Sequence, residues 1–157
     1  MSLFGPDKIV VNLDKYQYKP GDVIKGSVGL NLRKPVRARK IFVSLLGKMR
    51  VTHRDSKGNM QTEDLTVYEF TIPLDSENDY MSEIYRFEIK IQPDILQMHS
   101  SSQQLQQILQ AKLGTFGTFL GQMATGGPGP VRWMVHAQLD MPLKIDVQKT
   151  QDIVISQ

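Results

Sequence analysis

The chain has 157 residues, of which 40% are hydrophobic and 22% charged, and its formal net charge is +3. This length and composition fit one folded domain and exclude a disordered chain, and no apolar run approaches the roughly 20 residues of a membrane-spanning helix. Cysteine is absent, which excludes disulfides, thiol catalysis and cysteine-bound metals, and because no secretory signal is visible we expect a cytoplasmic protein.

Alternation of apolar and polar residues predicts β-strands along the first 91 residues. The pattern is clearest over 23–32, where Ile24, Val28 and Leu30 share one side, and over 84–91. The predicted strands cover 8–14, 23–32, 36–46, 48–54, 65–74 (ended by Pro73) and 84–91. Turn-forming residues lie between them, with a Pro-Gly turn at 20–21, a hairpin tip at 55–59 and a polar loop at 75–82.

The alternation of apolar and polar residues stops over residues 96–127. Apolar residues recur there at intervals of three or four, which predicts an amphipathic helix near 100–124. They are Leu105, Ile108, Leu109, Leu113, Phe116, Leu120 and Met123. Glutamines occupy the polar side of this helix, and a run rich in glycine and proline at 126–130 ends it.

Three further strands close the chain, at 131–139, 144–147 and 153–155. In the first of them, Trp133 and Val135 belong to the set that should face inward. Roughly eight regularly spaced strands with turns between them are typical of a two-sheet antiparallel sandwich. We therefore expect an all-β, immunoglobulin-like fold, with residues 1–157 as a single domain that carries the helical insert at about 96–127.

Two motifs lie in the first third of the chain. The first is Tyr18-x-x-Gly21-Asp22-x-Ile24-x-Gly26-x-Val28, and the second continues from Lys34-Pro35-Val36 to Ile41-x-Val43-x-Leu45-x-Gly47. Together they resemble the start of an arrestin N-terminal domain. Later segments keep the family order, including Tyr68-x-Phe70-x-Ile72-x-Leu74, Tyr85-x-Phe87-x-Ile89 and Val131-x-Trp133-x-Val135. The resemblance spans about residues 8–155, and it extends to the retromer-type and sporulation-control members of the arrestin-like family.

The resemblance implies a non-catalytic adaptor or scaffold that binds another protein, in trafficking or regulatory assembly. It also places 55–62 at the position of the family's receptor-engaging loop. Two departures restrict what the resemblance implies: the paired lysines of the family's first short strand are absent, and the chain ends where a second sandwich would begin. We therefore do not expect this chain to sense phosphorylated receptors as the two-domain members do.

Positive charge is concentrated in one segment. Residues 33–57 carry nine Lys/Arg and one acid, whereas 58–157 carry six Lys/Arg and twelve acids. Because strand side chains alternate, three of these cations should share one face of the strand over 48–54. The candidates for binding an acidic peptide, a phosphorylated side chain or an anionic lipid are Arg37, Arg39, Lys48, Arg50, Arg54 and Lys57. The alternative is a solvated sheet face that is balanced by Glu63, Asp64, Glu69 and Glu88.

The predicted helix has an apolar side that must be covered. Its candidate contact residues are Leu109, Leu113, Phe116, Phe119 and Leu120. This side could pack on its own sandwich, form a homo-oligomer, enter a partner's groove or lie on a membrane. Lys112 is the only cation on a polar side made largely of glutamine, which counts against lipid. A membrane-surface module using both the basic face and the insert is the alternative to a protein-binding adaptor.

The sequence shows no motif that is typical of a catalytic or metal site. His53, His99 and His136 are isolated in the sequence, and no acidic run has the order of a calcium loop. No nucleophile elbow, phosphate loop or dinucleotide-binding glycine pattern occurs, so we expect neither a cofactor nor an enzyme. Nucleic acid is not expected as a partner, because stacking aromatics are not interleaved with the basic residues.

Overall fold

The computed structural model describes residues 8–54, 56–96, 130–142 and 147–157. Within these ranges the chain forms ten β-strands and no helix, so the predicted all-β class is confirmed. The strands are β1 (Lys8–Leu13), β2 (Gln17–Tyr18), β3 (Val23–Asn31), β4 (Val36–Ala38), β5 (Lys40–Arg54), β6 (Met60–Asp75), β7 (Asn78–Tyr80), β8 (Ile84–Lys90), β9 (Val131–Asp140) and β10 (Val147–Ile155).

The helical insert predicted over 96–127 is not supported by the structure. Leu96 lies in a turn, and the rest of the predicted insert lies outside the described residues. The five candidate contact residues of its apolar side also lie outside them: Leu109, Leu113, Phe116, Phe119 and Leu120.

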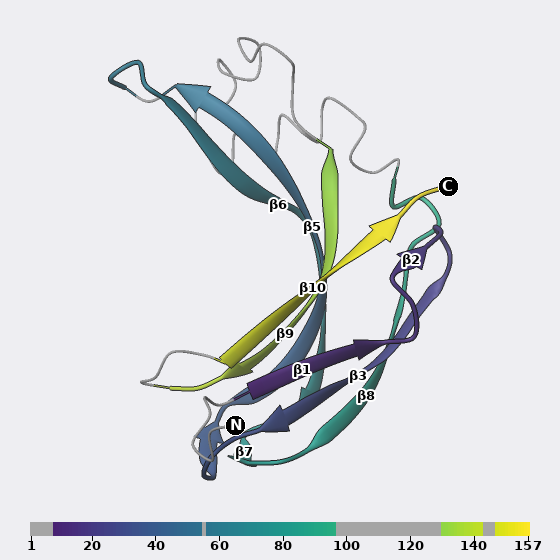
Figure 1. Cartoon of the computed structure of the whole chain (residues 1–157), viewed down its shortest axis with the longest axis vertical. Coiled ribbons are helices and arrows are strands. Elements are labelled where there is room, and N and C mark those ends of the chain that lie inside the picture. Colours follow the sequence, from purple (N-terminus) through teal and green to yellow (C-terminus); the bar gives the residue numbers. More distant parts are fainter. Residues whose placement is uncertain (1–7, 55, 97–129, 143–146) are drawn as a thin grey trace, which may run out of the picture.

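The strands form two main layers of the kind expected for an arrestin-type sandwich. A three-stranded sheet has the order β1-β3-β8, and a five-stranded sheet has the order β2-β10-β9-β5-β6; β4 and β7 make a separate two-stranded sheet. Figure 1 shows the three-stranded sheet on one side and β5 running along the whole molecule on the other. Pairing of β5 with β9 ends at Met49. Beyond Met49, β5 pairs only with β6 among the described strands, and we call this part of the β5–β6 hairpin the arm, at the upper left of Figure 1.

The core lies between the inward faces of the two sheets. Predicted inward residues such as Ile24 and Val28 on β3 and Val135 on β9 are fully buried and belong to one hydrophobic cluster. Period-two alternation therefore identified these inward faces correctly. A smaller cluster of Met49, Val51, Leu65 and Val67 occupies the same face of the arm, with Val131 packed against it.

Strand bounds differ from the prediction where tertiary pairing decides them. The strand predicted over 36–46 is interrupted at Arg39, because β4 pairs with β7 whereas β5 pairs with β6 and β9. Pro73 does not end β6 but lies within it. This is tolerated because β6 is the edge of its sheet, where a strand residue can lack an N–H donor.

Candidate functional site

The candidate site lies on the outer face of the five-stranded sheet, near the start of β9. Lys48 is half-buried and Arg50 exposed, and they alternate with Met49 and Val51, which are buried on the opposite face. The register of β5 and β9 sets Lys48 directly across from Arg132. We call Lys48, Arg50 and Arg132 the cation cluster.

One carboxylate bridges the two arginines of the cation cluster. Arg50 Nε donates to Asp64 Oδ1 at 3.3 Å, and Arg132 Nη2 lies 2.9 Å from Asp64 Oδ2. The hydrogen bond from Arg50 is the main cause that lowers the pKa of the Asp64 carboxyl, and the charge of Arg132 adds to it. The three cations and Asp64 together carry a charge of +2, and Glu69, which is paired with Leu46, is the next acid along β6 on this outer face. Exposed ion pairs contribute little to stability, so stability alone does not account for this concentration of charge.

Two further predicted cations lie along the arm. Arg54 ends β5 opposite Met60, and by strand alternation it shares the outer face with Lys48 and Arg50. Lys57 lies in the turn of the hairpin. Both residues lie beyond the cation cluster on the β5–β6 hairpin, whose course Figure 1 shows.

The other two predicted cations lie elsewhere and have acidic partners. Arg37 is 3.0 Å from Glu77 and 3.6 Å from Asp79, across the β4–β7 pair. Arg39 is 2.8 Å from Asp140, at the opposite end of β5 from the arm. Lys40 and Lys48 are eight residues apart on β5, or about 26 Å at ~3.3 Å per residue, so these arginines do not join the cation cluster.

Arg132 was not predicted to be part of this site. Its strand alternation indicated an outward side chain, but the cross-strand partner of β9 was not visible in the sequence. The expected balancing acids were partly misplaced as well. Asp64 does pair with the basic face and Glu69 lies on the same face opposite Leu46, whereas Glu88 lies on β8 in the other sheet.

The same outer face carries a row of hydrogen-bonded polar side chains. Ser44, only 2% exposed, lies 2.7 Å from the Thr71 hydroxyl. The ring nitrogens of His136 lie 3.0 Å from Thr150 Oγ1 and 3.1 Å from Gln138 Oε1, so its hydrogen-bond partners among the described residues are a hydroxyl and an amide. Across the described ranges, no three His, Asp or Glu side chains gather as a metal site would require.

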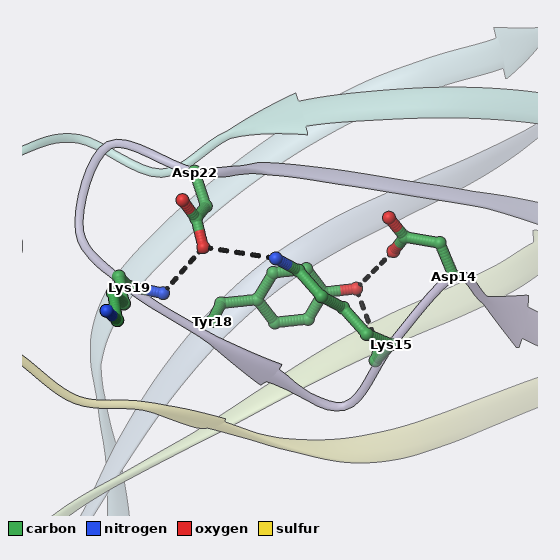
Figure 2. Close-up of polar contacts among 5 residues, drawn as sticks. All are labelled: Asp14, Lys15, Tyr18, Lys19 and Asp22. Atoms are coloured by element: carbon green, nitrogen blue, oxygen red, sulfur yellow. Dashed lines mark hydrogen bonds and ion pairs between the residues drawn. The ribbon is translucent and has the colours of Figure 1, made fainter.

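The first sequence motif has a structural role, shown in Figure 2. The Tyr18 hydroxyl donates to Asp14 Oδ1 at 2.7 Å and lies 2.7 Å from the Lys15 carbonyl oxygen. Asp22 accepts from the Lys19 backbone N–H at 2.8 Å and lies 3.3 Å from Lys15 Nζ. Gly21 has φ 93°, a left-handed conformation that glycine adopts without steric cost. These contacts fix the turns that bring β1, β2 and β3 together.

Tyr18→Phe is expected to lower the free energy of unfolding by about 1 kcal/mol at pH 7, because the buried ring keeps its packing but loses its hydrogen bonds. The Tyr18 hydrogen bond is also the main cause that lowers the pKa of Asp14 from its ordinary value of 3.8. A carboxyl with a lowered folded pKa stabilises the fold above its unfolded pKa, and this contribution is lost as the pH falls through the folded value. The difference between wild type and Tyr18→Phe should therefore shrink below about pH 4.

Urea unfolding at pH 7 and pH 2.5 measures both effects. Tyr16→Phe is the matched control, because Tyr16 is an exposed tyrosine two residues away. An equal loss in both variants, or a pH-independent loss in Tyr18→Phe, would contradict the assigned hydrogen bonds.

Comparison with known proteins identifies the family. The family model described as "Arrestin (or S-antigen), N-terminal domain" matches residues 8–157. The chain belongs to this arrestin family. The resemblance carried by the two early motifs is thereby confirmed. Arrestin-like domains generally interact with proteins and are generally non-enzymatic, so family membership indicates a regulatory or adaptor role.

Solved structures support the fold assignment. The crystal structure of Spo0M, a sporulation control protein from Bacillus subtilis, is similar with a TM-score of 0.61 at 15% identity, covering 98% of this arrestin-like chain and 51% of Spo0M. The chain therefore spans about half the length of Spo0M, and this likeness shows the fold alone.

A second solved structure gives a weaker overlap. It is the alkylpurine DNA glycosylase AlkC of Pseudomonas fluorescens bound to DNA containing an abasic site analog. It reaches a TM-score of 0.40 at 14% identity, over 96% of this chain and 30% of AlkC, which is too low to support an argument. No curated protein sequence matches the chain. Over the part of the arrestin-like chain that the structure describes, we find no helix with the length and hydropathy needed to cross a membrane.

Proposed function

We propose that this arrestin-like chain is a non-catalytic adaptor that binds an acidic or phosphorylated segment of a partner protein through its cation cluster. The observation that carries the proposal is the cross-strand pairing of Lys48 with Arg132, with Arg50 beside them and Asp64 as their described acidic neighbour. The family supports the general role, because arrestin-like domains generally interact with proteins.

The register places two positive side chains, Lys48 and Arg132, opposite each other. Two cations directly opposite each other on neighbouring strands destabilise a sheet, and the twin hydrogen bonds of Arg50 and Arg132 to Asp64 offset this only in part. A ligand carboxylate or phosphate placed between Lys48 and the two guanidinium groups would relieve the repulsion. Charge-assisted hydrogen bonds from arginine to such anions are among the stronger polar contacts.

We favour a protein segment over a membrane as the ligand, because arrestin-like domains generally interact with proteins. The cluster lies in the face of a sheet, and hydroxyl side chains adjoin it: Thr66 is paired with Lys48, and Thr62 is paired with Thr52 one step along the arm. Membrane-surface binding needs exposed apolar side chains that enter the lipid beside the cations. The residues expected to supply them, Phe116, Phe119 and Leu120, lie outside the described residues.

The test uses immobilised degenerate peptide libraries with a fixed central phosphoserine, glutamate or serine, and measures retention of the purified chain. We expect retention by the phosphoserine and glutamate libraries, and at least tenfold weaker binding by the double variant Arg50→Glu/Arg132→Glu, which corresponds to about 1.4 kcal/mol. Lys149→Glu, which reverses one charge at an exposed position of β10, is the control for charge reversal elsewhere on the chain and should bind as wild type does.

Three outcomes would overturn the proposal. They are equal retention by all three libraries, no retention at all, and equal binding by the double variant. Sedimentation with phosphatidylserine vesicles runs in parallel. Vesicle binding that is lost in Arg50→Glu/Arg132→Glu, without peptide retention, would assign the cluster to a membrane surface instead.

A further inference from the structure

The outer face of the three-stranded sheet carries an exposed apolar row with a glycine at its centre. The register pairs Val10 of β1 with Gly29 of β3, and Gly29 with Ile84 of β8. Val10 is 39% exposed and Ile84 is 77% exposed. All three residues belong to the outward set of their strands, since the alternate residues are buried in the core. This row lies on the other side of the sandwich from the cation cluster.

Nothing within the described fold requires glycine at position 29. A Cβ built on Gly29 meets no atom within 4 Å, and Gly29 has no positive φ. Gly26, three residues earlier on the same strand, differs: its Cβ would lie 2.4 Å from the Asn12 carbonyl oxygen. Glycine inside a strand is destabilising, and it often marks a place where another backbone or a ligand approaches closely.

The spacing of the row indicates what could approach. Neighbouring strands are about 4.8 Å apart, so Val10 and Ile84 stand about 10 Å apart on either side of Gly29. An α-helix with its side chains is about 10–12 Å wide. A helix lying along β3 would thus place apolar side chains over Gly29, between Val10 and Ile84.

The charge around the row indicates the chemistry of the partner. Outward residues of the three strands include four cations and one acid, a net charge of +3: Lys8, Lys25, Arg86, Lys90 and Glu88. Lys8 and Arg86 are each two residues from the apolar row on their strands. A second copy of this face would set like charges against each other, which disfavours a symmetric dimer here. Complementary charge requires an acidic partner.

We propose that this face is a second docking surface, which takes an acidic amphipathic helix of a partner protein with its apolar side over Gly29. The proposal goes beyond the cation cluster and is independent of it. Two binding faces on opposite sides of one sandwich would let the chain hold two partners at once.

In the test, a phage-displayed library of random 18-residue peptides is enriched for peptides that bind the immobilised wild-type chain. Enriched peptides should combine Asp or Glu with apolar residues at spacings of three and four. Their affinity should fall at least tenfold for Ile84→Asp and for Gly29→Val, which fills the open space with a residue suited to strands. Val154→Asp is the matched control, because Val154 is 52% exposed on β10 of the other sheet.

This experiment distinguishes a failure of the docking surface from a failure of the cation cluster. Enriched peptides should bind Arg50→Glu/Arg132→Glu as they bind wild type, and peptides lost in that variant would belong to the cation cluster. No enrichment, enriched peptides without acids, or binding insensitive to both Ile84→Asp and Gly29→Val would overturn the docking surface. Circular dichroism of each variant confirms that it is folded.

Discussion

Gly26→Ala is expected to lower the free energy of unfolding by roughly 3 kcal/mol, because the new Cβ would overlap a backbone atom of the neighbouring strand. It would lie 2.4 Å from the backbone oxygen of Asn12, 2.9 Å from Leu13 Cδ2 and 3.0 Å from Phe87 Cζ. The first of these atoms belongs to β1, whose position is set by its pairing with β3. Relief would require the two strands to separate.

Gly29→Ala provides the matched control on the same strand. Its Cβ meets open space, so we expect a change of less than about 0.5 kcal/mol or a small gain, since alanine has less conformational freedom to lose than glycine. Urea unfolding followed by circular dichroism measures both variants. Equal losses would show that the close approach of β1 to β3 at Gly26 is not what requires glycine there.

Trp133→Ala is expected to lower the free energy of unfolding by roughly 3–5 kcal/mol, because a large buried ring is removed. The ring packs edge-on against Tyr68, with centroids 5.7 Å apart, and its Cζ3 would lie 2.7 Å from a Cβ at position 47. Gly47 is where the register of β5 and β6 shifts at a bulge. The indole thus occupies the space that a side chain at this bulge would need.

A double-mutant cycle tests this arrangement. Gly47→Ala alone should cost about 1–2 kcal/mol, because the buried indole must shift to admit the methyl group. In the Trp133→Ala background the same substitution should cost almost nothing, which gives a coupling energy of about 1–2 kcal/mol. Additive losses in the cycle would mean that Gly47 is required for the bulge itself and not for the ring.

The strands and their inward faces could be predicted because alternation is a local property. A residue such as Val28 or Ile89 shows in its immediate neighbours which side it occupies, and both are fully buried. Local alternation fails where the outer face is also covered. Met134 was expected on the outward side of β9, as the register places it, yet it is only 6% exposed.

The candidate site was predictable only in part. Lys48 and Arg50 lie two residues apart, so their shared face follows from the sequence. Arg132 lies more than 80 residues away, and it reaches Lys48 only because β9 inserts between β10 and β5. The apolar row of Val10, Gly29 and Ile84 likewise needs the register of three strands.

The all-β class, most of the strands, their inward faces and the arrestin family could be inferred from the residues alone. These follow from period-two patterning, turn residues and short motifs, which act over a few neighbouring residues. The pairing of distant strands was needed to show that Arg50 and Arg132 share Asp64, why Pro73 is tolerated within β6, and which of the two strand glycines, Gly26 or Gly29, is sterically required. Each of these depends on pairing between distant segments, and the order and register of strands are set by the packing of the whole core.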